Sequence, residues 1–184
     1  VYCLAPLIVY NIVNSRKDWI CDRAFLDKRR KLQTYDLVGF TLQYELDLRN
    51  ITKIVREDKP KISFAGGPCV NLNYKILENI VDFFVIGEIE AVLEKILESY
   101  EENKEKKEFL KKISKFKGVF VPGLSKKAEM ANVENLDKVM YPIIQPFPEE
   151  INKNFVFGKV FILEIERGCP MHCRFCAMPF IYRK

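Results

Sequence analysis

The 184-residue sequence has little of several features that mark particular protein classes. It contains one histidine, one tryptophan and eight glycines, and no stretch of it approaches 18 consecutive uncharged apolar residues. The lack of a long apolar run excludes a membrane-spanning helix. No basic segment precedes an apolar core near the start, so the pattern of a secretory signal is missing as well. We therefore expect a cytoplasmic protein with no membrane partner.

Charge of one sign is not in large excess either. The 30 basic and 25 acidic residues leave a formal net charge of +5, which is too small to indicate nucleic acid as a partner. Hydrophobic residues make up 48% of the chain, and this composition excludes disorder. The six cysteines lie in a long chain rich in lysine and glutamate. That setting favours metal or redox chemistry over a disulfide framework.

Two kinds of apolar pattern alternate over residues 1–100. Short apolar runs, typical of strands covered on both faces, predict strands over residues 1–5, 19–25, 35–42, 61–65 and 81–86. Helical periodicity predicts helices opened by Pro6, over 46–56, over 71–80 and from Ile89 to Tyr100. Strands joined by helices predict a parallel sheet. We therefore expect an α/β domain with three layers, built on a doubly wound, mostly parallel sheet of five strands.

Residues 101–154 break this alternation. Residues 101–117 hold seven lysines and four glutamates, which predicts a solvated helix with Glu–Lys pairs; a nucleic-acid contact is the alternative. A short edge strand is predicted over residues 118–123. The remaining segment is polar and then rich in proline, so we expect a connector that wraps over the first domain.

A last strand is predicted over residues 155–166, and three closely spaced cysteines follow it. Cys169, Cys173 and Cys176 form the pattern C-x3-C-x2-C, with no fourth cysteine after them. Three thiolates in one loop can bind three irons of an iron–sulfur cluster. The remaining iron stays open for an exogenous ligand, just as catalytic zinc sites keep one position open.

Two other interpretations of these cysteines compete with an iron–sulfur site. One is a structural zinc site with His172 or a distant cysteine as the fourth ligand. His172 directly precedes Cys173, so the two could bind one ion only with a strained backbone, and structural zinc prefers paired C-x2-C motifs. The other is a chance grouping of structural cysteines, which the preceding strand, the glycine and the aromatic residue before the last cysteine make less attractive.

The segment ERGCPMHCRFC, Glu166–Cys176, resembles the signature of radical S-adenosylmethionine (radical SAM) enzymes. That signature is C-x3-C-x-aromatic-C after the first strand of a (β/α) barrel. The resemblance implies that Cys169, Cys173 and Cys176 bind a [4Fe–4S] cluster, and that Phe175 lies at the cofactor site. It further implies that S-adenosylmethionine (SAM) chelates the open iron, and that an electron donor reduces the cluster to generate a 5′-deoxyadenosyl radical.

The first domain is similar to the cobalamin-binding, Rossmann-like domain that precedes many radical SAM barrels. The segments GFTLQYE (39–45), AGGPC (65–69) and VIGEIE (85–90) carry this likeness. Together with the cysteine segment and IYR (181–183), they resemble one fused, largely uncharacterised radical SAM family. The chain departs from cobalt-coordinating domains because its single histidine is His172, in the cysteine loop. Cobalamin is thus a cofactor that the resemblance allows only without a histidine ligand.

The same three segments predict a site without help from the resemblance. Each follows a predicted parallel strand, and the carboxyl ends of parallel strands meet at one edge of a sheet. Glycine there permits close approach of a ligand. We therefore expect a cofactor-binding crevice lined by Gly66, Gly67, Pro68, Gly87, Glu88, Gln43 and Tyr44. The Gly66–Gly67 turn could instead make an interdomain contact, and both this turn and Gly87 could belong to ordinary tight βα turns.

These patterns divide the chain into residues 1–100, the connector 101–154 and the start of a truncated radical SAM domain at 155–184. A complete barrel needs about five further βα units. We therefore expect the full-length protein to be an enzyme with small-molecule cofactors, and the present chain to be inactive and to hold no catalytic residue. Strand 155–166 would lack its barrel partners, so dimerisation through it could arise as an artefact of truncation.

Two other functions remain open at this level. A tRNA or protein methylthiotransferase would use three additional cysteines of the first domain for a second cluster, and Cys3, Cys21 and Cys69 are available. A non-catalytic corrinoid-binding or regulatory module is the other alternative. Enough βα units beyond residue 184 to complete a barrel would favour the radical SAM enzyme.

Overall fold

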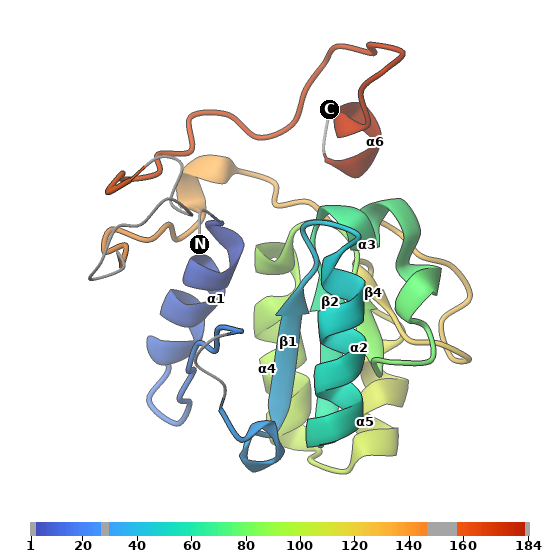
Figure 1. The fold of residues 1–184 in the computed structure, drawn as a ribbon. Helices are drawn as coiled ribbons and strands as arrows, with labels where there is room; N and C mark the ends of the chain where they lie inside the picture. The colour runs from blue at the N-terminus through green and yellow to red at the C-terminus, as the bar shows by residue number, and fades with distance from the viewer. Residues whose placement is uncertain (1–2, 27–29, 147–157, 183–184) are drawn as a thin grey trace.

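The computed structural model describes residues 3–26, 30–146 and 158–182, and it has α/β architecture (Figure 1). One sheet has the strand order β1-β2-β3-β4. Its strands are β1 (Leu37–Thr41), β2 (Ile62–Gly66), β3 (Phe83–Val85) and β4 (Val119–Phe120). The first three strands are parallel, and β4 pairs antiparallel with β3 at the edge. The sheet is therefore mostly parallel, as predicted.

Helices cover both faces of this sheet (Figure 1). The elements α2 (Asp47–Asp58), α3 (Pro68–Asn73) and a short 3-10 helix (Tyr74–Leu77) connect the parallel strands, whereas α4 (Leu93–Glu102) and α5 (Lys106–Ile113) connect β3 to β4. A further helix, α1 (Ala5–Asn14), packs on α4 through Val13, Leu93 and Leu97. The three-layer arrangement is confirmed, and so are the predicted helices at Pro6, over 46–56 and up to Tyr100.

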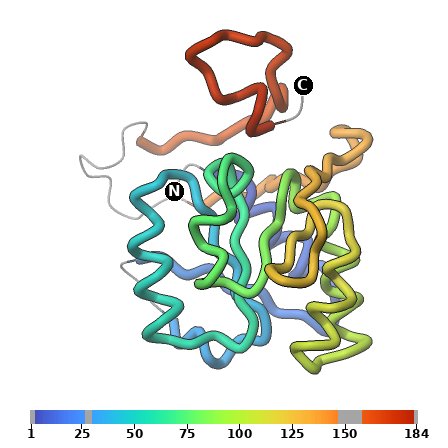
Figure 2. Tube along the Cα trace, turned by 90° about the vertical axis from the view of Figure 1, so that its right-hand side faces the viewer, coloured from blue at the N-terminus to red at the C-terminus, as the bar shows by residue number. Residues whose placement is uncertain are grey.

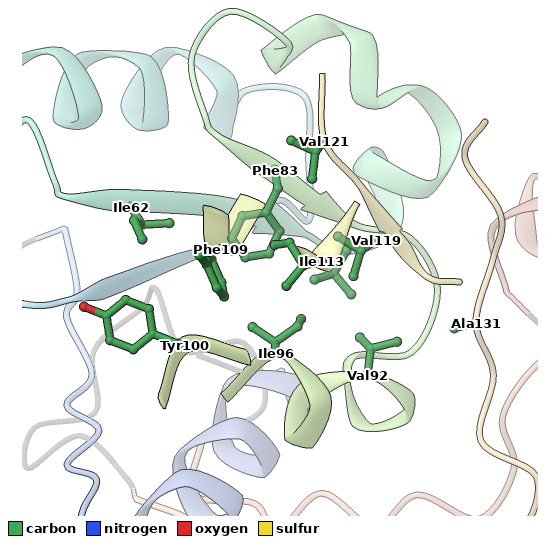
Figure 3. Packing of buried hydrophobic residues seen from close by; sticks show 11 residues of the cluster. Ile62, Phe83, Val92, Ile96, Tyr100, Phe109, Ile113, Val119, Val121 and Ala131 are labelled. Carbon is green, nitrogen blue, oxygen red and sulfur yellow. The ribbon is translucent and has the colours of Figure 1, made fainter. Parts of the chain in front are cut away.

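The strands β2 and β3 bury both of their faces because their side chains alternate between two cores. Phe83 and Val85 pack with α4 and α5, and Figure 3 shows Phe83 beside Phe109 of α5. Phe84 and Ile86 point into the other core, with Ile51 of α2. Strands buried in this way need apolar residues at successive positions, which is why continuous apolar runs located them correctly.

The sheet is not doubly wound in the part of the chain that the structure describes. Its strand order follows the chain order without reversal. Ile51 of α2 and Val70 of α3 share one core, so both crossovers lie on one face, as crossovers of one hand between successive strands must. The opposite face is covered by α4 and α5, which lead into an antiparallel strand rather than into a second winding.

Of the five strands predicted over residues 1–100, the first two, over 1–5 and 19–25, were predicted wrongly. Among the described residues, 3–5 lead directly into α1, and 19–25 form no strand. Trp19 instead packs edge-on against Tyr100, with ring centroids 6.0 Å apart, and its indole N–H donates to the Glu101 carboxylate. Side-chain packing on α4 thus takes the place of backbone pairing for this segment.

The strand predicted over residues 155–166 is also absent from the described residues 158–166, whereas residues 155–157 lie outside the described ranges. A side chain supplies the hydrogen bonds that a neighbouring strand would have made. The Gln145 carboxamide accepts a bond from the Ile162 N–H (2.9 Å) and donates one to the Ile162 carbonyl (2.8 Å). Backbone polar groups need partners, and here one amide satisfies both groups of a residue.

The end of α2 offers a test of its local geometry. Lys59 follows the helix with φ 46° and ψ 62°, the left-handed conformation, and its N–H donates to the Val55 carbonyl (3.0 Å). This conformation costs a side-chain-bearing residue about 1 kcal/mol, and glycine avoids that cost. We expect Lys59→Gly to raise the free energy of unfolding by about 1 kcal/mol in urea titrations. Lys53→Gly inside the helix should lower it by a similar amount; a loss with Lys59→Gly would contradict the assigned cap.

No helix among the described residues is long and apolar enough to cross a membrane.

Candidate functional site

The loops that follow β1, β2 and β3 meet at one edge of the sheet, as the sequence predicted. After β1, the Leu42 N–H donates to the Gly66 carbonyl (2.8 Å), and the Leu42 carbonyl accepts from the Cys69 N–H (3.3 Å). After β3, the Gly87 N–H donates to Oδ1 of Asn71 in α3 (2.8 Å). Backbone and side-chain bonds therefore tie the three loops into one surface.

Glycine is required at position 67 because backbone atoms of the preceding loop lie against it. Gly67 has φ 110°, and an added Cβ would lie 2.8 Å from the Leu42 carbonyl oxygen. Pro68 then opens α3, a position that suits proline. The Gly66 position has more room, since the nearest atom to an added Cβ is 3.6 Å away. The close approach predicted for a ligand at this turn is made by the preceding loop.

Gly87 has a similar relation to the connector. Its φ is 98°, and an added Cβ would lie 2.2 Å from the Ala131 carbonyl oxygen. That carbonyl accepts from the Glu88 N–H (2.8 Å), and the Ala131 N–H donates to the Ile86 carbonyl (3.0 Å). Residue 87 is glycine because the connector backbone runs against it.

A buried ion-pair cluster joins this loop to the segment that carries the three cysteines. Arg167 lies 3.0 Å from Oε1 of Glu90 and 3.7 Å from Oε2 of Glu88, and it pairs in a bidentate manner with Glu164 (2.9 and 2.7 Å). Its side chain is only 10% exposed. The Glu164 carboxylate raises the pKa of Arg167, against the opposing effect of burial, and the two other carboxylates add to the rise. Arg167 is therefore permanently charged.

The segment 158–182 lies over the carboxyl edge of the sheet, as both views show (Figures 1 and 2). Its last element, α6 (Met178–Ile181), contacts α3. The side-chain N–H of Asn71 donates to the Ile181 carbonyl (2.9 Å), and Ile181 is buried. The edge that we expected to face a cofactor thus contacts the chain's own cysteine-bearing segment through Asn71 and α3.

Gln43 lies at this edge between two thiols. Its Nε2 donates to Sγ of Cys3 (3.3 Å), and its carbonyl accepts from the Cys69 thiol (3.1 Å). Burial raises the pKa of both thiols. The pKa of Tyr182 is also raised, first by burial and then by Cys3 and Cys69. The neighbouring Tyr44 is 71% exposed.

The three cysteines of the predicted cluster site lie in the loop between Arg167 and α6. All three are half-buried, and a turn in which the Cys176 N–H donates to the Cys173 carbonyl (3.1 Å) links two of them. Phe175 is 93% exposed. In the described part of the chain, no three histidine, cysteine or acidic side chains are gathered closely enough to bind a metal ion. The donor set is the one that iron–sulfur clusters take, so the residues fit the cluster in chemistry, although the thiols are not drawn together.

Cys3, Cys21 and Cys69 do not form a second cluster of ligands in the described structure. Cys3 precedes α1, whereas the Cys21 N–H donates to the side-chain oxygen of Asn14 (2.9 Å), at the far end of that helix. A helix of this length separates its ends by about 15 Å. This separation argues against the methylthiotransferase alternative.

Sequence reasoning missed four residues of this edge: Asn71, Glu90, Arg167 and Tyr182. Three of them lie in or beside the segments quoted for the family resemblance, GEIE, ERGC and IYR. Their polar side chains next to glycine or cysteine were a usable signal. Asn71 gave none, because it reads as an ordinary residue of a short helix.

Comparison with known proteins agrees with this picture. Residues 26–122 match the family described as "Radical SAM proteins, N-terminal". The chain is similar to the uncharacterized protein MJ0966 of Methanocaldococcus jannaschii, with 35% identity over 189 residues, covering 99% of this chain and 39% of that relative. The chain thus spans 39% of the length of this relative. No solved structure matches it. Because the family match covers more than half of the chain, the chain belongs to the family of radical SAM protein N-terminal regions.

Proposed function

We propose that the full-length protein is a radical SAM enzyme of unassigned substrate, and that Cys169, Cys173 and Cys176 hold its [4Fe–4S] cluster. The observation that carries the proposal is the C-x3-C-x-aromatic-C segment in a chain of the radical SAM N-terminal family. Three thiols in one loop leave one iron without a protein ligand, and SAM needs such a position. His172 neighbours a ligand but is not one.

The residues around the loop support this assignment. The three thiols are half-buried, so they are accessible for assembly of a cluster and still partly shielded. Phe175 is exposed and free to contact a cofactor or the remainder of the protein. When bound, a [4Fe–4S] cluster supplies the electron for reductive cleavage of SAM to a 5′-deoxyadenosyl radical, as the family resemblance implies. The electron donor and the substrate are partners of the full-length protein.

The first domain takes a supporting part in this proposal. Its edge loops contact the connector at Gly87 and the cysteine-bearing segment at Asn71. A cobalamin at the same edge would have to displace these contacts, so cobalamin is not part of the proposal. No observation on the residues that the structure describes favours the regulatory-module alternative.

The test is anaerobic reconstitution of the full-length protein with iron and sulfide, followed by reduction with dithionite in the presence of SAM. We expect thiolate-to-iron charge-transfer absorption in the visible range and the release of 5′-deoxyadenosine and methionine, measured by chromatography. A sample without reductant is the control and should release neither product. A protein that binds zinc in preference to a cluster, or a cluster that leaves SAM intact, would refute the proposal.

A further inference from the structure

The loop that carries the three cysteines is attached to the first domain on both of its flanks. Arg167 lies just before Cys169, and Ile181 lies shortly after Cys176. The partners of both flanks belong to the same edge of the sheet: Glu88 and Glu90 for Arg167, and Asn71 for Ile181. These two attachments use different interactions, because one is an ion pair and the other a hydrogen bond to a carbonyl.

The first attachment is buried, so the loss of one partner would be costly. The side chains of Arg167, Glu88 and Glu90 are 10%, 8% and 7% exposed, respectively. Glu88 is itself held in place, since its Oε2 accepts from the Val133 N–H of the connector (2.6 Å). Removal of the guanidinium would leave neighbouring carboxylates buried and repelling one another, which is far more destabilising than the loss of a surface ion pair.

The second attachment also involves the loop after β3. The Asn71 carboxamide accepts from the Gly87 N–H (2.8 Å) and donates to the Ile181 carbonyl (2.9 Å). One side chain therefore links the loop after β3 to the end of the cysteine segment. The residues Gly87–Glu90 take part in both attachments, and their own position is set by the Ala131 contact described above.

We propose that the loop Gly87–Glu90, together with Asn71, forms the attachment surface of the cysteine loop. Arg167 and Asn71 are then positioning residues for the cluster. The proposal rests on the function proposed above. A loop with fixed ends loses less conformational freedom when its thiols are drawn onto a cluster. The first domain therefore lowers the cost of assembling the cluster site through these contacts.

The test begins with the cluster-free full-length protein. We expect Arg167→Met to speed amide hydrogen exchange in peptides that cover residues 168–180 by at least about tenfold, because a buried ion pair is broken. Arg167→Lys, which keeps the charge but not the bidentate geometry, should restore much of the protection. Arg16→Met is the matched control: Arg16 also pairs with two glutamates, Glu94 and Glu101 of α4, and its loss should leave the cysteine loop unchanged.

A second variant keeps the proposal testable if Arg167→Met does not fold. Asn71→Asp retains the acceptor for the Gly87 N–H but loses the donor to the Ile181 carbonyl, and it should speed exchange on the α6 side of the loop. After reconstitution, both variants should also shift the electron paramagnetic resonance spectrum of the reduced cluster.

The outcomes separate the two proposals. Unchanged amide hydrogen exchange in a folded Arg167→Met or Asn71→Asp protein would overturn the proposed attachment surface, even if the wild-type protein binds a cluster. Faster amide hydrogen exchange in these variants, together with a wild-type protein that binds no cluster, would refute the proposed function. The attachment of the cysteine loop to the first domain would still be supported.

Discussion

Cys173→Ala in the full-length protein is expected to abolish the [4Fe–4S] cluster, with loss of the visible charge-transfer absorption, of bound iron and of SAM cleavage. The reason is that the two remaining thiolates of this loop cannot supply three corners of a cluster. The measurements are iron and sulfide content per chain, visible absorption, and 5′-deoxyadenosine release after anaerobic reconstitution.

Two variants control this experiment. Cys21→Ala removes a thiol near the far end of α1, beside Asn14, and should retain the full cluster. His172→Ala removes the side chain next to Cys173 and should also retain it, because histidine is not a ligand in this assignment. A full cluster in Cys173→Ala would refute the assignment, and its loss in His172→Ala would point to a histidine ligand instead.

The second large effect is expected for Gly87→Ala, which should lower the free energy of unfolding by about 3 kcal/mol or more. Two costs add at this position. A residue with a side chain pays about 1–2 kcal/mol for the left-handed backbone, and an added Cβ would lie 2.2 Å from the Ala131 carbonyl oxygen, an overlap that forces backbone atoms apart. Urea denaturation of wild-type and variant proteins measures the difference.

Gly123→Ala is the matched control for this substitution. Gly123 also has a positive φ, 75°, but among the described residues no atom beyond its two chain neighbours lies within 4 Å of an added Cβ. It should therefore lose only about 1–2 kcal/mol, the cost of the backbone conformation. Equal losses at the two positions would show that the connector does not press on Gly87 in solution. A stable Gly87→Ala protein with altered cofactor binding would revive the ligand interpretation of this glycine.

The regular elements of the first domain could be predicted because their signals are local. A strand such as β3 is buried on both faces, so its apolar run is continuous. The helix α4 buries one face, with Leu93, Ile96, Leu97 and Tyr100 at helical spacing. Neither pattern requires knowledge of the partner, and the same holds for the cysteine spacing, which identifies the kind of donor set without a structure.

Predictions that depended on a partner were less successful. An apolar segment becomes a strand only if an edge is available, and the described residues of the segments 19–25 and 155–166 met side chains of Glu101 and Gln145 instead. The sequence pattern of a strand was present in both segments. Their backbone pairing was decided by which groups the folded chain placed beside them.

Four features follow from the amino-acid sequence alone: the α/β class, the parallel strands, the convergence of three loops at one edge and the three-cysteine donor set. Each depends on local pattern, chain order or side-chain chemistry. The contacts that fill that edge depend instead on how the chain folds. Arg167 meets Glu88 and Glu90 of a loop far earlier in the chain, and Asn71 meets Ile181. Such pairs leave no periodic signal, since complementary charge and hydrogen bonding select a partner in space and not at a fixed separation in sequence.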